Sequence, residues 1–197
     1  MEAIMSQTTK RALAASLKKL LATKPLGKIT VIDIVNDCEV NRQTFYYHFQ
    51  DINDLLEWLI MNEAKQALGD DKTYDTWQQG FIKILQYARE NKSIVMNISN
   101  SIDHDQAEKY LYNIAYDLLI GVVDEKASGM PIKEEDKKAI ADFYKYAFVG
   151  LTLDWFKKGM KQDPQVIIDN LGVLIQGNFK EALDKYRTDK MTESQTK

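Results

Sequence analysis

A short stretch near the N-terminus gathers side chains suited to binding nucleic acid. Residues 41–48 are Asn-Arg-Gln-Thr-Phe-Tyr-Tyr-His. Arginine and glutamine pair with base edges in the major groove of DNA, and threonine, tyrosine and histidine bind phosphate oxygens. Phe45 and Phe49 are four residues apart, so a helix would turn both inward and leave the polar groups outside. The same composition also fits a solvated polar helix with two aromatic anchors.

The preceding residues predict the element that must hold this helix. Thr30 and Asp33 have the spacing of a capping box, in which the threonine hydroxyl accepts the Asp33 N–H and the aspartate reaches back. Asn41 is a strong N-cap for the helix that follows. Two short helices joined by a tight turn form a helix-turn-helix, which places the N-terminal residues of its second helix against base edges. In this sequence those residues are Asn41, Arg42 and Gln43.

The charge distribution favours the same interpretation. The chain has 197 residues and a formal net charge of −3, so the whole molecule is not a general binder of polyanions. The first 50 residues hold seven Lys and Arg against four Asp and Glu, whereas the remainder holds 19 against 25. A basic head on an acidic body fits a DNA-binding domain with a separate control domain.

The residues that catalysis or metal binding would need are not grouped in the sequence. The single cysteine, Cys38, excludes an intramolecular disulfide, and the two histidines stand outside any Cys/His cluster with zinc spacing. No nucleophile–base pair, carboxylate dyad or phosphate-binding glycine loop stands out. We therefore predict that the protein is not an enzyme and uses no cofactor and no metal. With no long apolar run and no signal peptide, we also predict a cytoplasmic protein with no membrane partner.

The whole chain is predicted to be all-α, because it has three prolines, nine glycines and no alternating apolar and polar runs. Residues 1–6 are expected to be a loose start. About nine helices are expected, over residues 7–23, 30–37, 41–48, 53–68, 74–91, 92–101, 103–128, 133–158 and 164–186. The expected domains are a helix-turn-helix domain (1–51), a connecting helix (52–69), a ligand-binding and dimerisation domain (70–187) and a disordered tail (188–197).

The helix-turn-helix residues carry a resemblance to a known family. The runs T-V-x-D-I at 30–34, V-N-R-Q-T-F-Y-Y-H-F at 40–49 and D-L-L at 54–56 resemble the N-terminal DNA-binding domain of the TetR/AcrR family of bacterial transcription regulators. The resemblance implies a helix-turn-helix reader on an all-helical dimer that a small ligand usually controls. It also assigns DNA-binding roles to Thr30, Asn41, Arg42, Gln43, Thr44, Tyr46, Tyr47 and His48. Of these, Thr30 would contact phosphate, and Tyr46 and His48 would grip the DNA backbone.

Two positions depart from the family pattern. Many members have a phosphate-binding lysine shortly after the final phenylalanine, where this chain has Gln50, Asp51 and Ile52. The expected grip on DNA is weaker there. Many members also have Ala-Gly in the turn, where this chain has Cys38 and Glu39. Glu39 must then adopt a turn geometry that glycine takes at no steric cost.

The last two long helices carry more apolar surface than one bundle face needs. A helix that is apolar nearly all round is normally buried on two sides, so pairing with a second subunit would form a four-helix interface. The resemblance implies the same pair of helices, although interior helices of a thick monomeric bundle would show the same pattern. The candidate interface residues are Phe148, Leu151, Phe156, Leu171, Leu174 and Ile175.

Aromatic residues of the body are candidates for an effector pocket, which the family encloses within its middle helices. Aromatic groups with a polar tip suit an apolar pocket with few polar contacts, and they suit a core equally. The candidates are Trp77, Phe81, Tyr110, Phe143 and Trp155. The segment 143–160 is similar to the C-terminal body of a Firmicute subgroup that includes DhaS-type activators of dihydroxyacetone kinase operons.

The sequence therefore predicts a homodimeric transcriptional regulator. It would bind an inverted repeat in double-stranded DNA, the operator, through helix 41–48, and an unknown small-molecule effector in the C-terminal domain would switch it. The alternative is a co-regulator of the same fold that acts mainly through a protein partner, with weak or no DNA binding of its own.

Overall fold

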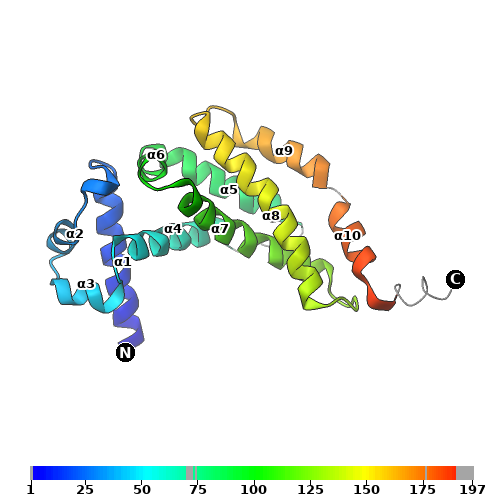
Figure 1. The fold of residues 1–197 in the computed structure, drawn as a ribbon, viewed down its shortest axis with the longest axis horizontal. Helices are drawn as coiled ribbons and strands as arrows, with labels where there is room; N and C mark the ends of the chain where they lie inside the picture. Colours follow the sequence, from blue (N-terminus) through cyan, green and yellow to red (C-terminus); the bar gives the residue numbers. More distant parts are fainter. Residues whose placement is uncertain (1, 70–72, 74, 176, 190–197) are drawn as a thin grey trace. The chain divides into compact units, whose positions relative to one another are not determined.

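The computed structural model describes residues 2–69, 73, 75–175 and 177–189, and within these residues it contains helices and no strands (Figure 1). The all-α prediction is confirmed. In chain order the elements are α1 (Glu2–Leu21), η1 (Leu26–Lys28), α2 (Val31–Asp37), α3 (Arg42–His48), α4 (Ile52–Leu68), α5 (Trp77–Glu90), α6 (Lys92–Ser101), α7 (His104–Lys126), α8 (Glu134–Lys157), α9 (Pro164–Ile175) and α10 (Asn178–Tyr186).

The chain forms two compact units. The first comprises Met1–Ala64 with Asn91–Tyr110, and the second comprises Lys65–Glu90 with Leu111–Lys197. The division falls inside α4 and inside α7, and it assigns α6 to the unit that holds the helix-turn-helix. The functional domain boundaries expected from the sequence, at residues 51 and 69, remain a prediction. Residues 70–72 of the expected break and 190–197 of the expected tail lie outside the described residues.

The first unit has one continuous apolar core. Its fully buried side chains come from all four N-terminal helices and include Leu13, Leu17, Ile34, Phe45, Leu55 and Leu56. Ile94, Ile98 and Ile102, spaced four residues apart, pack against this core from α6 and its C-cap. That spacing aligns them on one face of the helix, so α6 completes the core of the first unit.

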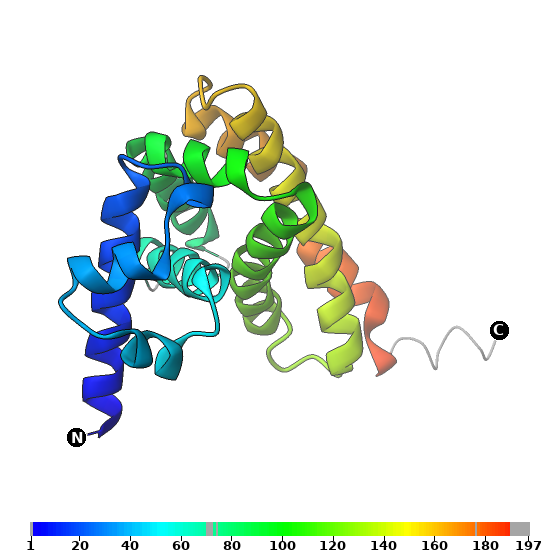
Figure 2. The same ribbon diagram turned by 60° about the vertical axis from the view of Figure 1, so that its left-hand side comes forward.

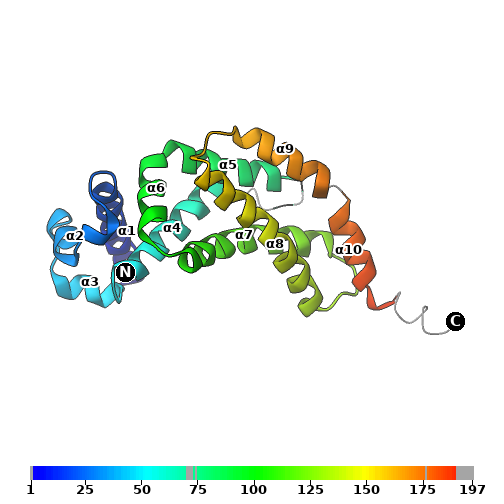
Figure 3. The same cartoon turned by 45° about the horizontal axis from the view of Figure 1, so that its top comes forward.

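The second unit is a bundle in which aromatic side chains join the helices. In Figures 1 and 3, α9 lies along α5, and in Figure 2 α10 lies beside the N-terminal part of α8. Phe148 of α8 packs against Trp77 and Phe81 of α5, with ring centroids 5.6 and 4.7 Å away. Tyr144 packs against Phe179 of α10 at 4.3 Å.

Three predicted helices differ from the structure by three residues or more at a boundary. The expected helix 164–186 is two helices, because Gly177 adopts φ of +83°, a left-handed conformation that a right-handed helix cannot continue through. The first helix begins at Glu2, so residues 2–6 of the expected loose start are helical, and residue 1 lies outside the described residues. The third difference is at α5, which begins at Trp77 and not at residue 74.

Candidate nucleic-acid interface

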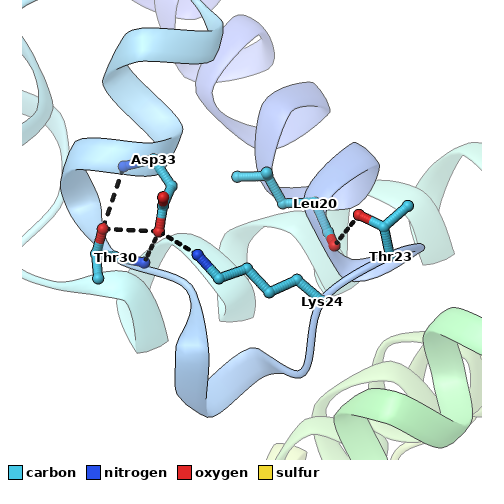
Figure 4. A network of polar contacts seen from close by, with 5 residues as sticks. All are labelled: Leu20, Thr23, Lys24, Thr30 and Asp33. Carbon is cyan, nitrogen blue, oxygen red and sulfur yellow. Dashed lines mark hydrogen bonds and ion pairs between the residues drawn. The ribbon is translucent and has the colours of Figure 1, made fainter.

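The N-terminus of α2 is fixed by the capping box that the sequence predicts. The Thr30 hydroxyl oxygen accepts the Asp33 N–H at 3.2 Å, and Asp33 Oδ2 accepts the Thr30 N–H at 2.8 Å (Figure 4). The same carboxylate oxygen accepts from Lys24 Nζ at 2.7 Å. These bonds favour the ionised form, and the pKa of Asp33 falls to about 2, with the bond from Lys24 as the largest cause and those from Thr30 next.

This arrangement uses both donors of Thr30. Its hydroxyl donates to Asp33 Oδ2 at 2.7 Å, and its N–H donates to the same atom. The predicted phosphate contact of Thr30 therefore requires its hydroxyl to exchange one negatively charged acceptor for another. The present bond to carboxylate and the predicted bond to phosphate are both charge-assisted hydrogen bonds.

The turn between α2 and α3 adopts the geometry that its sequence requires. Glu39 has φ of +55°, which confirms the prediction that it takes a left-handed turn conformation that glycine adopts at no steric cost. The Cys38 thiol donates to the Ile34 carbonyl oxygen at 2.8 Å, and burial raises the pKa of that thiol. A raised pKa leaves less of the reactive thiolate, so Cys38 acts as a small packing group in the turn.

The helix α3 is held at its start by a side-chain cap and from beneath by two phenylalanines. Asn41 Oδ1 accepts the Thr44 N–H at 2.8 Å and the Thr44 hydroxyl at 3.0 Å. Phe45 and Phe49 are buried, as predicted. Two of the predicted DNA-binding residues, Asn41 and Thr44, therefore bind each other and fix the orientation of the helix.

The outer face of α3 presents the other predicted contacts to solvent. Arg42 and Gln43 are exposed in the first turn, and Tyr46 and Tyr47 are 58% and 78% exposed in the second. The Tyr47 ring meets the His48 ring edge-on, with centroids 4.9 Å apart. The structure thus exposes Arg42, Gln43, Tyr46 and Tyr47 on one short helix, with His48 half-buried beside them.

Lys10 of α1 adds a cation that the sequence did not connect with this helix. Its Nζ lies 5.5 Å from the centroid of the Phe49 ring. The pKa of His48 is lowered, first by desolvation and then by the charge of Lys10. His48 is therefore a neutral hydrogen-bond donor at pH 7, and Lys10 supplies the positive charge near the end of α3. The sequence gives no sign of this neighbour, because Lys10 and Phe49 lie far apart along the chain.

The predicted pocket residues do not share one environment. Trp77 and Phe81 are buried side by side against Phe148 in the second unit. Trp155 is buried in the same unit, and its indole N–H donates to the Gln162 carbonyl oxygen at 2.9 Å. Phe143 differs from these, because it is 72% exposed.

Tyr110 belongs to the first unit, where it is buried and its hydroxyl accepts from Gln106 Nε2 at 2.8 Å. Burial raises the pKa of Tyr110, so its hydroxyl stays protonated. The structure therefore supports Trp77 and Phe81 as neighbours and gives Phe143 and Tyr110 different surroundings.

The predicted interface residues also divide between core and surface. Phe148, Leu171 and Ile175 are buried within the subunit, whereas an interface residue must be accessible to a partner. Leu174 is 69% exposed, Leu151 is 40% exposed and Phe156 is half-buried. Further exposed apolar side chains lie on the same two helices, and we call the following set the apolar patch: Phe143, Tyr146 and Leu151 of α8 with Val166, Val173 and Leu174 of α9.

Other kinds of site find no support in the part of the chain that the structure describes. None of its His, Cys, Asp and Glu side chains form a group of three or more that could hold a metal ion. Over the same residues, no helix has the length and apolar character needed to span a membrane.

The helix-turn-helix and the body of the chain each match a known protein family. A family described as "Bacterial regulatory proteins, tetR family" matches residues 7–59, which span α1 to α3 and the start of α4. A second, described as "Transcriptional regulator C-terminal region", matches residues 75–177, more than half of the chain. The chain belongs to the TetR family of bacterial regulatory proteins. Its relatives are transcriptional regulators and not enzymes, as the sequence predicted.

Individual relatives of this TetR-family protein include DhaS regulators. The chain is 26% identical over 157 residues to "HTH-type dhaKLM operon transcriptional activator DhaS" of Lactococcus lactis subsp. lactis (strain IL1403), a match that covers 77% of this chain and 81% of the relative. A solved structure described as "Dihydroxyacetone kinase operon activator DhaS" has a TM-score of 0.65 at 22% identity, covering 87% of this chain and 96% of that one. The structural likeness shows a shared fold, and the resemblance to DhaS-like regulators is confirmed.

Proposed function

We propose that this TetR-family protein binds an inverted-repeat operator as a homodimer and that a small molecule in its C-terminal region controls the binding. The observation that carries the proposal is the outer face of α3. A seven-residue helix that is capped by Asn41 and anchored by Phe45 and Phe49 presents its polar side chains to solvent. Such pre-organisation serves directional hydrogen bonding to base edges, since the donors already have their orientation before DNA arrives.

Each side chain of this face has a role that its chemistry suits. Arg42 pairs with a guanine, because the bidentate contact of arginine with O6 and N7 is the commonest specific pairing. Gln43 reads a neighbouring base edge. Tyr46, Tyr47 and His48 donate to phosphates and fix the register of the helix without carrying sequence information.

The apolar patch supports dimerisation. Phe143, Val173 and Leu174 are each more than two-thirds exposed at 72%, 77% and 69%. Large apolar side chains with this much exposure favour an interaction site, and a second copy of the chain would supply a self-complementary partner. Two copies would present two α3 helices to two half-sites, which is why the operator is expected to be an inverted repeat.

The effector is expected to act on the second unit, where the aromatic cluster of Trp77, Phe81 and Phe148 joins α5 to α8. An effector that inserts among these rings would change the packing of both helices. It would alter DNA affinity only as far as it binds one arrangement better than the other. The L. lactis relative is described as an activator of an operon. We infer that this protein likewise controls transcription in the cytoplasm, with target genes near its own.

Footprinting of purified protein on the DNA upstream of its own gene and the neighbouring genes tests the proposal. We expect a protected inverted repeat, and an affinity that falls steeply between two salt concentrations because phosphate contacts release counterions. Protection of a single half-site, or of no sequence by a folded dimer, would contradict the operator-binding function.

A partner-dependent co-regulator is the second candidate, and the start of α4 favours it. Asp51 accepts the N–H groups of Asn53 and Asp54 at 2.8 and 2.9 Å, and Asp54 accepts the Gln50 N–H at 2.9 Å. Two exposed carboxylates therefore occupy a region where the family commonly has a phosphate-binding lysine. Absence of footprinting protection together with retention of a protein partner would favour this candidate.

A further inference from the structure

A single side chain of α6 binds the end of α1 and the turn that follows it. Asn97 Nδ2 donates to the carbonyl oxygens of Leu21 and Lys24 at 2.7 and 2.9 Å, and its Oδ1 accepts the Leu26 N–H at 3.1 Å. The orientation of the amide is fixed by these partners, because the reverse orientation would set the amide oxygen against two carbonyl oxygens. Asn97 therefore bonds three backbone groups that lie more than 70 residues earlier in the chain.

The bonded backbone groups need such a partner. The last four carbonyl oxygens of a helix have no N–H donor within it, and the chain after α1 would ordinarily supply N–H groups for them. Here Pro25 follows Lys24 and has no N–H to donate. The amide of Asn97 replaces the missing local donors, so the path of the chain from α1 to η1 depends on α6.

Lys24 carries this constraint onward to the helix-turn-helix. Its backbone carbonyl is held by Asn97, and its side chain donates to Asp33 Oδ2. Asp33 in turn binds the N–H and hydroxyl of Thr30, which caps α2 (Figure 4). A continuous series of hydrogen bonds therefore runs from α6 through the turn to the N-terminus of α2.

This series of hydrogen bonds joins two regions of the chain that match two different family descriptions. Asn97 lies within the match to the regulatory C-terminal region at 75–177, whereas Leu21, Lys24 and Thr30 lie within the DNA-binding match at 7–59. Yet α6 packs in the same compact unit as the helix-turn-helix. Asn97 thus lies in the match to the C-terminal region, yet its side chain binds backbone groups of the N-terminal DNA-binding region.

We propose that Asn97 is a positioning residue for operator binding, which acts on Thr30 and α2 through Lys24 and Asp33. The proposal rests on the proposed function, because it assigns Asn97 a role in the binding of DNA that α2 and α3 contact.

The test uses the full-length protein and three variants. Asn97→Ala removes the amide, and Asn97→Asp keeps its size while setting a carboxylate against the two carbonyl oxygens. Asn100→Ala is the matched control, because Asn100 is an exposed asparagine of the same helix. The probe is the DNA duplex that the wild-type protein protects in footprinting. Asn97→Ala should weaken binding by about 3- to 30-fold. Asn97→Asp should weaken it further, and Asn100→Ala should bind like the wild type.

Amide hydrogen exchange in the absence of DNA distinguishes an effect of Asn97 on Thr30 from an effect on its own turn alone. The Leu26 N–H loses its acceptor directly in Asn97→Ala, so its faster exchange is expected in either case. The Thr30 N–H is bonded to Asp33 and not to Asn97. We expect the Thr30 N–H to exchange faster in Asn97→Ala and in Lys24→Met. If the double variant exchanges no faster than either single variant, Asn97 acts on Thr30 through Lys24.

The outcomes distinguish the two proposals. A wild-type protein that protects no DNA overturns the proposed function, whereas the exchange measurements still judge the link from Asn97 to Thr30. Wild-type protection together with unchanged affinity in both Asn97 variants overturns the role of Asn97 alone. Unchanged exchange at Thr30 also overturns it, because Asn97 would then stabilise only its own turn.

Discussion

Two surfaces of the molecule are equally exposed and chemically opposite. Tyr47 on α3 is 78% exposed, and Val173 in the apolar patch is 77% exposed. The α3 face combines guanidinium, amide, phenol and imidazole groups, whereas the apolar patch offers hydrocarbon and aromatic rings. Exposure alone therefore does not identify a partner, and the chemistry of the exposed groups must decide between DNA and a second protein surface.

The two surfaces also differ in what lies beneath them. The polar face depends on directional hydrogen bonds, so its helix is fixed by the Asn41 cap and by two phenylalanines. The apolar patch needs no such precision, since hydrophobic burial is non-directional. Its helices are supported by bulky core residues such as Phe148, only a few positions from the exposed Phe143 and Tyr146. The predictions below test this contrast.

Phe148→Ala should give the largest effect, because it removes a ring that packs on Trp77 and Phe81 inside the second unit. We expect a loss of about 3–5 kcal/mol in the free energy of unfolding, measured by urea titration. Phe143→Ala changes the same residue type on the same helix at an exposed position, and it should cost clearly less. Equal losses in the two variants would erase the distinction between core and patch on α8.

Leu174→Glu tests the apolar patch itself. A carboxylate there would be buried without a partner in the dimer, so we expect the free energy of association to weaken by at least about 2 kcal/mol. Sedimentation analysis over a range of concentrations would show dissociation into monomers with an unchanged helical content. Gln165→Glu, an exposed position on the same helix, serves as control and should remain dimeric. A dimeric Leu174→Glu protein would place the interface elsewhere.

Arg42→Ala tests the polar face. Loss of a bidentate contact should cost roughly 1–3 kcal/mol of operator affinity and relax the preference for one base pair. Tyr46→Phe should instead weaken all sequences alike, because the lost hydroxyl contacts phosphate. Binding titrations with an operator library measure both quantities. Unchanged base preference in Arg42→Ala would show that another side chain reads that position.

Glu39→Gly tests the turn that orients the polar face. Glycine relieves the steric cost of φ of +55° but loses more entropy on folding, so we expect a net gain of roughly 0.5–1 kcal/mol in the free energy of unfolding. Glu39→Ala keeps the Cβ and should bring no such gain. If alanine stabilises as much as glycine, the cost at this position lies in the glutamate side chain and not in the backbone.

Asp33→Asn should give the smallest effect and the clearest pH dependence. The pKa of Asp33 is about 2 in the folded protein, below its ordinary value of 3.8. A lowered folded pKa contributes stability above the unfolded value, and that stability is lost as the pH falls from about 4 through 2. Thermal unfolding across this range should show a shallower decline in Asp33→Asn than in the wild type. Parallel curves would mean that the Lys24–Asp33 pair adds nothing to stability.

The helix-turn-helix was predictable because its determinants are local. Thr30 caps α2 through Asp33 three residues later, and Asn41 caps α3 through Thr44 at the same spacing. Glu39 stands where the turn needs a left-handed residue, and the structure shows it in that conformation. Each of these interactions spans four residues or fewer, so the sequence contains both partners side by side.

The core and surface positions of α8, the break before α10 and the partners of Asn97 could not be predicted, because they depend on contacts between residues distant in the sequence. Phe148 and Phe143 are both apolar residues of one helix that is apolar on most sides, so periodicity could not tell which faces the core. Gly177 interrupts an otherwise continuous helical pattern, and a lone glycine is also tolerated inside helices. The partners of Asn97 lie in α1 and its turn, and an isolated asparagine in a short helix gives no sign of them.

The assignment of residues 91–110 to the first unit bears on how the protein is made. Synthesis begins at the N-terminus, and domains generally fold as units when their residues become available. The head of this regulator lacks α6, the isoleucines that pack on its core and the amide that holds its first turn until residue 110 has left the ribosome. Completion of the DNA-reading unit must therefore wait until the chain has been synthesised through Tyr110.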